Sequence, residues 1–174
     1  MNNLHVYTGE GKGKTTAAMG LALRSLGHGN RVLIAQFMKN GISGELKALE
    51  QLPNATVKTA PPIKGFVTRL SDGDRQAAAD EQRCFADSLI SLIEEIKPQT
   101  VILDELNVAL NLGMLGEETA LRLIDCAMKY GETAATGRGA PDWLIEKADY
   151  VSRIEAQKHP YNTRKQPARK GVEW

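Results

Sequence analysis

The sequence has little excess charge of either sign and almost no cysteine. Its 174 residues carry a formal net charge of +1, and the two cysteines are Cys84 and Cys126. The balanced charge provides no overall attraction to nucleic acid or to an anionic membrane, so any basic site must be local. The cysteines lack the spacing of a metal site and lie among apolar residues in helical patterns, which predicts core thiols in a reducing compartment. We therefore expect no nucleic-acid partner.

Long hydrophobic runs are also missing. No apolar stretch approaches the length that crosses a membrane, and the chain runs from Met1 into a predicted strand without an export signal. These absences favour a cytoplasmic enzyme or binding protein with no membrane partner. The hydrophobic content of 42% over 174 residues is enough for the core of one domain and too little for two.

A glycine-rich stretch near the amino terminus carries the strongest functional signal. Residues 7–16 read Tyr-Thr-Gly-Glu-Gly-Lys-Gly-Lys-Thr-Thr, between an apolar run and a helical pattern. Successive glycines let backbone N–H groups turn toward one anion, the positive end of the next helix points at the same place, and Lys14 adds a charge. The strict P-loop pattern requires glycine where this chain has Thr8. The residues predicted to bind the nucleotide here are Thr8, Gly9, Glu10, Gly11, Lys12, Gly13, Lys14, Thr15 and Thr16.

Apolar runs and helical periods alternate along the rest of the chain. Strands are predicted at residues 4–7, 31–37, 55–59, 100–103 and 150–156, with a marginal one at 133–136. Helices are predicted at residues 15–26, 45–52, 71–96, 106–112, 117–130 and 141–147, and a loop at 63–70. The alternation predicts an α/β, P-loop NTPase (RecA-like) fold, a mostly parallel sheet with helices on both faces. We expect one nucleotide-binding domain at residues 1–156 and an irregular basic tail at 157–174 that packs on or near the active site.

Two acids follow the apolar run at 100–103. Asp104 and Glu105 stand at the carboxyl end of a buried strand, where a nucleotide-binding fold holds Mg²⁺ for a bound triphosphate. With the hydroxyl of Thr15, they predict a site for Mg²⁺ or Mn²⁺ and, with the loop, ATP as the ligand. The plainer alternative is that Asp104 caps the following helix and Glu105 is only solvated.

Several segments together resemble one known family, the P-loop ATP:corrinoid adenosyltransferases. The resemblance spans nearly the whole chain in order, and the shifted first glycine is similar to the modified loop of that family. The segments are residues 8–20, Gln36-Phe37-Met38-Lys39, residues 101–106, Thr136-Gly137-Arg138-Gly139-Ala140-Pro141 with residues 144–149, and Lys158-His159-Pro160.

The resemblance implies that a cobalt(I) corrinoid, cobalamin or a precursor, attacks the 5′-carbon of ATP and that triphosphate leaves. Lys14 and Glu105 would be catalytic, since Lys14, the loop amides and a metal stabilise a leaving triphosphate. The resemblance also implies an external reductase for cobalt and a homodimer. A RecA-like ATPase or kinase, in which Glu105 polarises a water at the γ-phosphate, and a non-catalytic carrier are the competing interpretations.

Three further roles come from the resemblance alone. Arg24 and Arg138 fall where the family has nucleotide-binding arginines, although an exposed helix residue and a solvated turn charge are the plainer interpretations. Phe66 falls on an aromatic that binds the corrinoid and displaces its lower axial ligand, and an ordinary buried aromatic is the alternative. Thr68 stands where a tryptophan is usual. His159 is not expected to ligate cobalt, because a further axial ligand opposes formation of cobalt(I).

Overall fold

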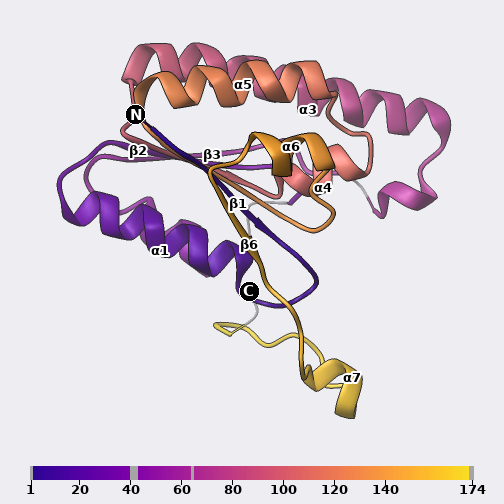
Figure 1. The fold of residues 1–174 in the computed structure, drawn as a ribbon. Coiled ribbons are helices and arrows are strands. Elements are labelled where there is room, and N and C mark those ends of the chain that lie inside the picture. Colours follow the sequence, from indigo (N-terminus) through magenta and orange to yellow (C-terminus); the bar gives the residue numbers. More distant parts are fainter. Residues whose placement is uncertain (1, 40–42, 64, 173–174) are drawn as a thin grey trace.

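The computed structural model describes residues 2–39, 43–63 and 65–172 (Figure 1). Among these residues, no helix has the length and apolar character needed to cross a membrane. The strands are β1 (Leu4–Thr8), β2 (Val32–Gln36), β3 (Ala55–Thr59), β4 (Thr100–Asp104), β5 (Glu132–Thr136) and β6 (Tyr150–Arg153). The helices are α1 (Lys14–Gly27), α2 (Gly44–Leu49), the 3₁₀ turn η1 (Val67–Arg69), α3 (Asp72–Ile96), α4 (Leu106–Asn111), α5 (Glu117–Tyr130), α6 (Asp142–Lys147) and α7 (Pro160–Arg164).

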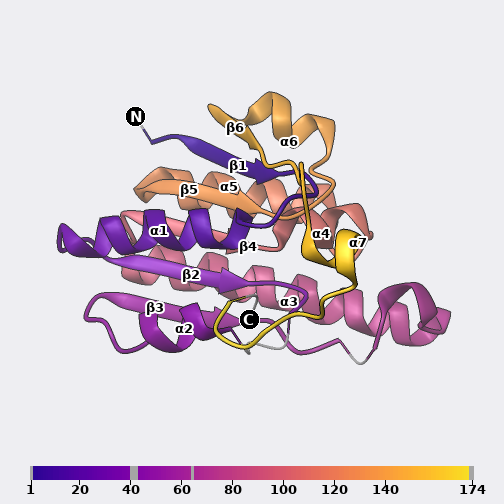
Figure 2. The ribbon, with the colours of Figure 1, turned by 90° about the horizontal axis from the view of Figure 1, so that it is seen from below.

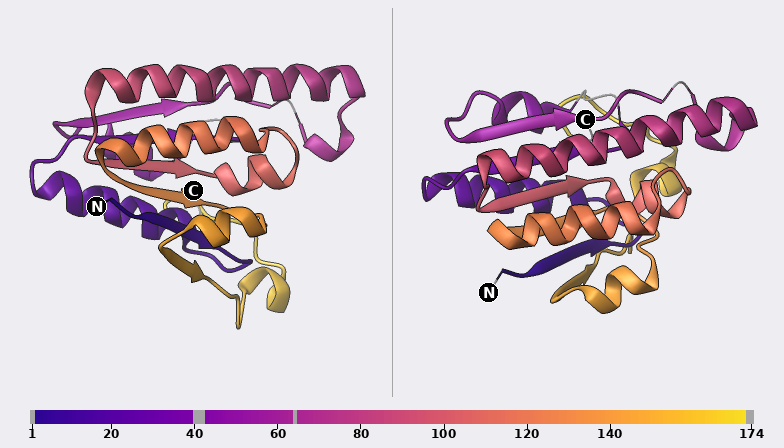
Figure 3. Two further views of the ribbon diagram at one scale, coloured as in Figure 1. Left: turned by 45° about the horizontal axis from the view of Figure 1, so that its top comes forward. Right: turned by 90° about the horizontal axis from the view of Figure 1, so that it is seen from above.

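The strands form one sheet in the order β3-β2-β4-β5-β1-β6, and every described pair is parallel. Each residue of β2 and β4 is buried, because their continuous apolar runs are covered on both faces. The long helices α3 and α5 lie side by side over one face, and α1 lies on the other (Figures 1 and 3). The predicted parallel α/β architecture is confirmed.

Strand β5 has a more central place than its sequence suggests. It is a short run of small and polar residues, Glu-Thr-Ala-Ala-Thr, and residues 133–136 were predicted only as a marginal strand. In the structure it lies between β4 and β1, and Thr133 to Thr136 are buried. The small side chains of Ala134 and Ala135 leave room for helices on both faces of the sheet. Ala135 packs in the hydrophobic cluster that includes α3 and α5, and Ala134 packs in the cluster that includes α1. This position places Thr136 at the end of a strand between β4, which ends at Asp104, and β1, which leads into the phosphate loop.

Four expectations from the sequence differ from the structure. Cys126 is buried as predicted, but Cys84 is exposed. The buried positions of α3 nearest to it are Gln82 and Ala86, and Cys84 lies off that buried stripe of the helix. The segment predicted as a loop contains η1, and β6 ends at Arg153 rather than at residue 156. The tail predicted to be irregular contains α7, which begins at Pro160. Residues 40–42, residue 64 of the segment predicted as a loop, and residues 173–174 of the predicted tail lie outside the described residues.

The carboxyl ends of the strands meet at one edge of the molecule. Seen from below, α4 and the tail with α7 lie beyond the arrowheads of β1 and β2 (Figure 2). The phosphate loop, which joins β1 to α1, and the acids that follow β4 belong to this same edge. The topology therefore collects the predicted site residues from distant parts of the chain in the place where parallel sheets bind ligands.

Candidate active site

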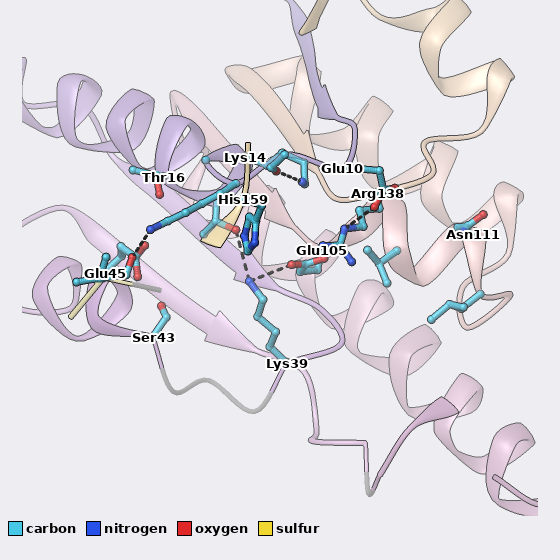
Figure 4. Close-up of a pocket in the computed structure, with 17 residues that line it drawn as sticks. Glu10, Lys14, Thr16, Lys39, Ser43, Glu45, Glu105, Asn111, Arg138 and His159 are labelled. Carbon is cyan, nitrogen blue, oxygen red and sulfur yellow. Dashed lines mark hydrogen bonds and ion pairs between the residues drawn. The ribbon is translucent and has the colours of Figure 1, made fainter. Parts of the chain in front are cut away.

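A pocket of about 580 Å³ lies at this edge (Figure 4). Residues 10–16 of the phosphate loop form one wall, and Lys39, Glu105 and Arg138 reach in from three other connections. Val108, Asn111 and Leu112 contribute from the α4 side, while His159 and Val172 contribute from the tail. Most of the loop residues predicted to bind nucleotide are therefore brought together, whereas Thr8 and Gly9 do not line the cavity.

The glycines of the loop are required by a close approach to the end of β6. Gly9 has φ 97°, and a Cβ there would lie 2.5 Å from the carbonyl oxygen of Ile154. A Cβ at Gly11 would lie 2.8 Å from the backbone carbon of Glu155. The Gly11 N–H donates to Ile154 O at 2.8 Å, and the Ile154 N–H donates to Thr8 O at 2.8 Å. Thr8 is still the last residue of β1, and the close approach to Ile154 begins at the next residue. This explains why the first glycine of the loop is at position 9.

Lys14 is held inside the loop that it is predicted to serve. Its Nζ donates to Gly9 O at 2.7 Å and to Gly11 O at 2.6 Å. Burial lowers the pKa of the Lys14 ammonium, and the nearby positive charge of Arg138 lowers it further. The two carbonyls hold the ammonium inside the loop, and Lys14 lines the pocket, where it would meet an anionic group.

Asp104 is the buried centre of the site. Its side chain is fully inaccessible, and Oδ1 accepts hydrogen bonds from Thr15 Oγ1 at 2.8 Å and Thr136 Oγ1 at 2.6 Å. Oδ2 accepts from Gln36 Nε2 at 2.8 Å. The Thr136 hydroxyl in turn accepts the Glu105 N–H at 3.1 Å. Thr15, Thr136 and Gln36 thus all donate to Asp104, so both oxygens of its buried carboxylate have hydrogen-bond partners.

Glu105 and Lys39 complete the charged cluster. Glu105 has φ 61° and is the N-cap residue of α4, so the helix-cap role considered for Asp104 is wrong. The Lys39 Nζ lies 3.0 Å from Glu105 Oε1 and 3.3 Å from Asp104 Oδ2. Glu105 is thus paired rather than simply solvated. Burial acts to lower the pKa of Lys39, but the two carboxylates outweigh it and raise the pKa.

Lys39 was not among the predicted site residues. Its sequence signal was the Gln36-to-Lys39 segment, which contributed to the family resemblance without a role for any residue in it. Glu45 and Ser43 also line the pocket without having been predicted. No periodicity marks such positions, because they reach the site only through the connection from β2 to β3.

The two carried-over arginines differ in location. Arg138 lines the pocket from the turn after β5, and its Nε lies 3.1 Å from Glu10 Oε2, with both side chains largely exposed. Figure 4 shows this pair at the rim. Arg24 lies in the last turn of α1, is exposed, and is not among the lining residues. Ten residues of helix separate it from Lys14, a rise of about 15 Å.

Phe66 stands on the surface just before η1. It is 72% exposed, and the guanidinium carbon of Arg69 lies 5.4 Å from the centre of its ring. The alternative of an ordinary buried aromatic is therefore wrong. Phe66 is not among the residues that line the pocket, and Thr68 in η1 is also exposed. A corrinoid contact through Phe66 stays a prediction.

The tail reaches the phosphate loop. Val172 O accepts a hydrogen bond from Lys12 Nζ at 2.8 Å, and both residues line the pocket. His159 also lines it, and its Nδ1 accepts the Tyr161 N–H at the start of α7. One ring nitrogen is thus used in capping a helix, which accounts for this histidine structurally.

The donor set suits a hard divalent cation. Thr15, Asp104 and Glu105 offer hydroxyl and carboxylate oxygens, which Mg²⁺ and Mn²⁺ prefer. Within the described ranges, no three His, Cys, Asp or Glu side chains are grouped as a metal cage. Mg²⁺ typically combines one or two carboxylates with phosphate oxygens of the substrate, and Asp104 and Glu105 are the carboxylates at this edge.

Comparisons with known proteins identify one family. Residues 1–174 match the family model described as ATP:corrinoid adenosyltransferase BtuR/CobO/CobP. A corrinoid adenosyltransferase from Pseudomonas aeruginosa is 34% identical over 172 residues, which are 98% of this chain and 83% of that protein. The corrinoid adenosyltransferase CobA of Salmonella typhimurium is 32% identical over 164 residues, 90% of this chain and 78% of that protein.

The comparison of structures concerns the fold alone. A KaiC-like protein from Pyrococcus horikoshii superposes with a TM-score of 0.56 at 14% identity, covering 90% of this chain and 74% of that one. This likeness supports the predicted RecA-like class. Sequence, pocket and relatives lead to one assignment: the chain belongs to the ATP:corrinoid adenosyltransferase family and is an enzyme of that kind.

Proposed function

We propose that this enzyme transfers the 5′-deoxyadenosyl group of ATP to the cobalt(I) of a corrinoid and that the residues of the loop and the acid edge carry the transfer. Cobalt(I) supplies the electron pair that forms the cobalt–carbon bond. The bond between the 5′-carbon and its oxygen breaks, and that oxygen leaves with the triphosphate. The protein then has to stabilise departing negative charge and to align two reactants.

The observation that carries this assignment is the match of residues 1–174 to the family model, together with the curated relatives. The pocket fits it, because Lys14, Lys39 and Arg138 line the same cavity as the phosphate loop and would meet the charge of a departing triphosphate. The relatives are named as adenosyltransferases, so the ATPase or kinase interpretation is not favoured.

Lys14, Lys39, Arg138 and the amides of residues 12–16 would stabilise the triphosphate as it leaves. Gly11 is different, because its N–H already donates to Ile154. Thr15, Asp104 and Glu105 would hold Mg²⁺ or Mn²⁺, and the cation would neutralise phosphate charge there. This metal set is supported by the oxygen donors and their convergence on one edge.

The proposal for corrinoid binding rests on different observations from those for the triphosphate. Phe66 is proposed as the corrinoid-binding aromatic because it is exposed and falls on the matching position of the family motif. An external reductase for cobalt and a homodimer are carried over from the resemblance, and a cytoplasmic location stays a prediction from the sequence. A nucleotide role for Arg24 rests on the resemblance alone.

One reaction tests the proposal. Protein, ATP and Mg²⁺ are mixed with chemically reduced cob(I)alamin, the corrinoid spectrum is followed, and the phosphate products are separated. We expect a light-sensitive alkylcobalamin together with one triphosphate for each adenosyl group transferred. Release of inorganic phosphate at the same rate with and without corrinoid would instead identify an ordinary ATPase.

A further inference from the structure

The chain bends sharply where β2 ends. Phe37 N–H still continues the ladder by donating to Asp104 O at 2.9 Å. Met38 then has φ 61°, and Lys39 N–H donates back to Phe37 O at 2.7 Å. This tight turn directs the Lys39 side chain toward the acids at the end of β4, as Figure 4 shows for Lys39 and Glu105. Its position is therefore built by backbone geometry.

The Lys39 ammonium contacts one oxygen from each member of the proposed cation set. Its Nζ lies 3.0 Å from Glu105 Oε1, 3.3 Å from Asp104 Oδ2 and 3.4 Å from Thr15 Oγ1. The carboxylate of Asp104 is fully buried, whereas the Lys39 side chain is 38% exposed. The ammonium is thus the accessible partner of a buried anion, with a path outward into the pocket.

We propose that Lys39 is a resident counter-ion of the cation site, which exchanges its acid partners for phosphate oxygens when metal and triphosphate arrive together. The inference deepens the proposed function and rests on its metal ligand set. A divalent ion and the ammonium use the same oxygens, so they compete for that place. Repulsion between two cations about 4 Å apart also makes simultaneous occupation costly.

The exchange makes metal binding depend on the nucleotide. Metal alone must displace Lys39 and leave its ammonium without an anionic partner in a partly desolvated position. A triphosphate provides new acceptors, because Lys39 lines the same pocket as Lys14 and the loop. The protein is therefore selective for the metal–nucleotide complex over the free metal, and Lys39 is a positioning residue for that complex.

The test measures binding of Mn²⁺ alone, by the electron paramagnetic resonance signal of the free ion, without ATP or corrinoid. Lys39→Met removes the competing charge, and we expect it to bind Mn²⁺ at least about tenfold more tightly than the wild type. Lys39→Arg retains the charge and should bind as weakly as the wild type. Lys147→Met is the matched control, since Lys147 is a partly exposed lysine paired with Asp125 at 2.9 Å outside the pocket lining.

Equal or weaker Mn²⁺ binding by Lys39→Met, or none at all, would overturn the inference, as would an equal gain in Lys39→Arg. If Lys39→Met fails to fold, nuclear magnetic resonance of the Lys39 ammonium in wild-type protein decides the matter. Mg²⁺ alone should leave its signal unchanged, and Mg²⁺ with inorganic triphosphate should shift it; a shift with Mg²⁺ alone contradicts the exchange. The Mn²⁺ measurements do not depend on adenosyl transfer. A failure of the proposed transfer reaction can therefore be told apart from a failure of the proposed exchange at Lys39.

Discussion

At the phosphate side of the pocket, Asp104 is fully buried and accepts hydrogen bonds from Thr15, Thr136 and Gln36. At the segment predicted to meet the corrinoid, Phe66 is 72% exposed with a single arginine over its ring. The first region is preorganised, so charge that develops there meets donors already in place. The second presents an apolar ring to solvent. The comparison indicates that the fold itself preorganises the proposed triphosphate side, whereas the segment proposed for the corrinoid is exposed.

The largest expected effect is at the preorganised side. Lys14→Ala removes the ammonium that Gly9 and Gly11 carbonyls hold at the loop, and we expect the adenosylation rate constant to fall by about 10²–10³-fold. Single-turnover kinetics with excess cob(I)alamin measure this step. Lys147→Ala serves as a control outside the pocket. A fall of less than about fivefold would show that Lys14 does not stabilise the leaving triphosphate.

Thr136→Val tests the buried network itself. The substitution keeps the shape of the side chain but removes one donor to Asp104 and the acceptor of the Glu105 N–H, so unfolding should cost about 1–3 kcal/mol less. Urea denaturation measures the change. Thr133→Val is the matched control, since Thr133 is equally buried in β5 and makes a longer hydrogen bond of 3.4 Å to Gly131 O. If both variants lose the same free energy of unfolding, the hydrogen bond from Thr136 to Asp104 does not contribute more than an ordinary buried hydroxyl.

Phe66→Ala should separate function from stability at the open side. Because the ring is exposed, the free energy of unfolding should change by less than about 0.5 kcal/mol. Loss of an aromatic contact worth roughly 0.5–1.5 kcal/mol should slow adenosylation from cobalt(II) with a mild reductant by a few-fold to about tenfold. Prereduced cobalt(I) is the control, where the rate should hardly change. An unaltered rate from cobalt(II) would remove this loop from the mechanism.

The smallest effect is expected far from both regions, where Tyr130 donates a hydrogen bond to exposed Glu94 between α5 and α3. This bond, with help from Lys129, lowers the pKa of Glu94 from 4.5 to about 2. The lowered pKa means that the stabilisation is present above the ordinary value and is lost as the pH falls toward 2. Tyr130→Phe should therefore lower the urea midpoint slightly at neutral pH and by less at pH 2, where about half of the Glu94 carboxylate is protonated. A constant difference at both would show that packing, not this carboxylate, is responsible.

Much of the scaffold was predictable because its signals are local. The apolar runs of β2 and β4 require burial on both faces, and Ser71 caps α3 by accepting the Asp74 N–H. Strand β5 gave a weak signal, since its burial depends on neighbours far away in the sequence rather than on hydrophobic residues of its own. Cys84 was misplaced because helical spacing alone did not locate the edge of the buried stripe.

The candidate site shows the same division. The loop, Asp104 and Glu105 carry recognisable spacing, and the structure brings Lys14, Thr15 and both acids to one edge. Lys39 lies in a polar turn whose sequence says nothing of its direction, and only the bend at Met38 places it against the acids. Arg24 matches a motif position yet lies along α1 away from the pocket lining.

The contact between the phosphate loop and the end of β6 has a consequence for protein engineering. Gly9 and Gly11 fit only against the backbone of Ile154 and Glu155, which also takes the Gly11 N–H. The loop sequence alone therefore does not determine the loop conformation, because the loop packs against a segment more than 140 positions later in the chain. Transplanting residues 7–16 into another nucleotide-binding protein would transfer the motif without the backbone of Ile154 and Glu155 against which the loop packs.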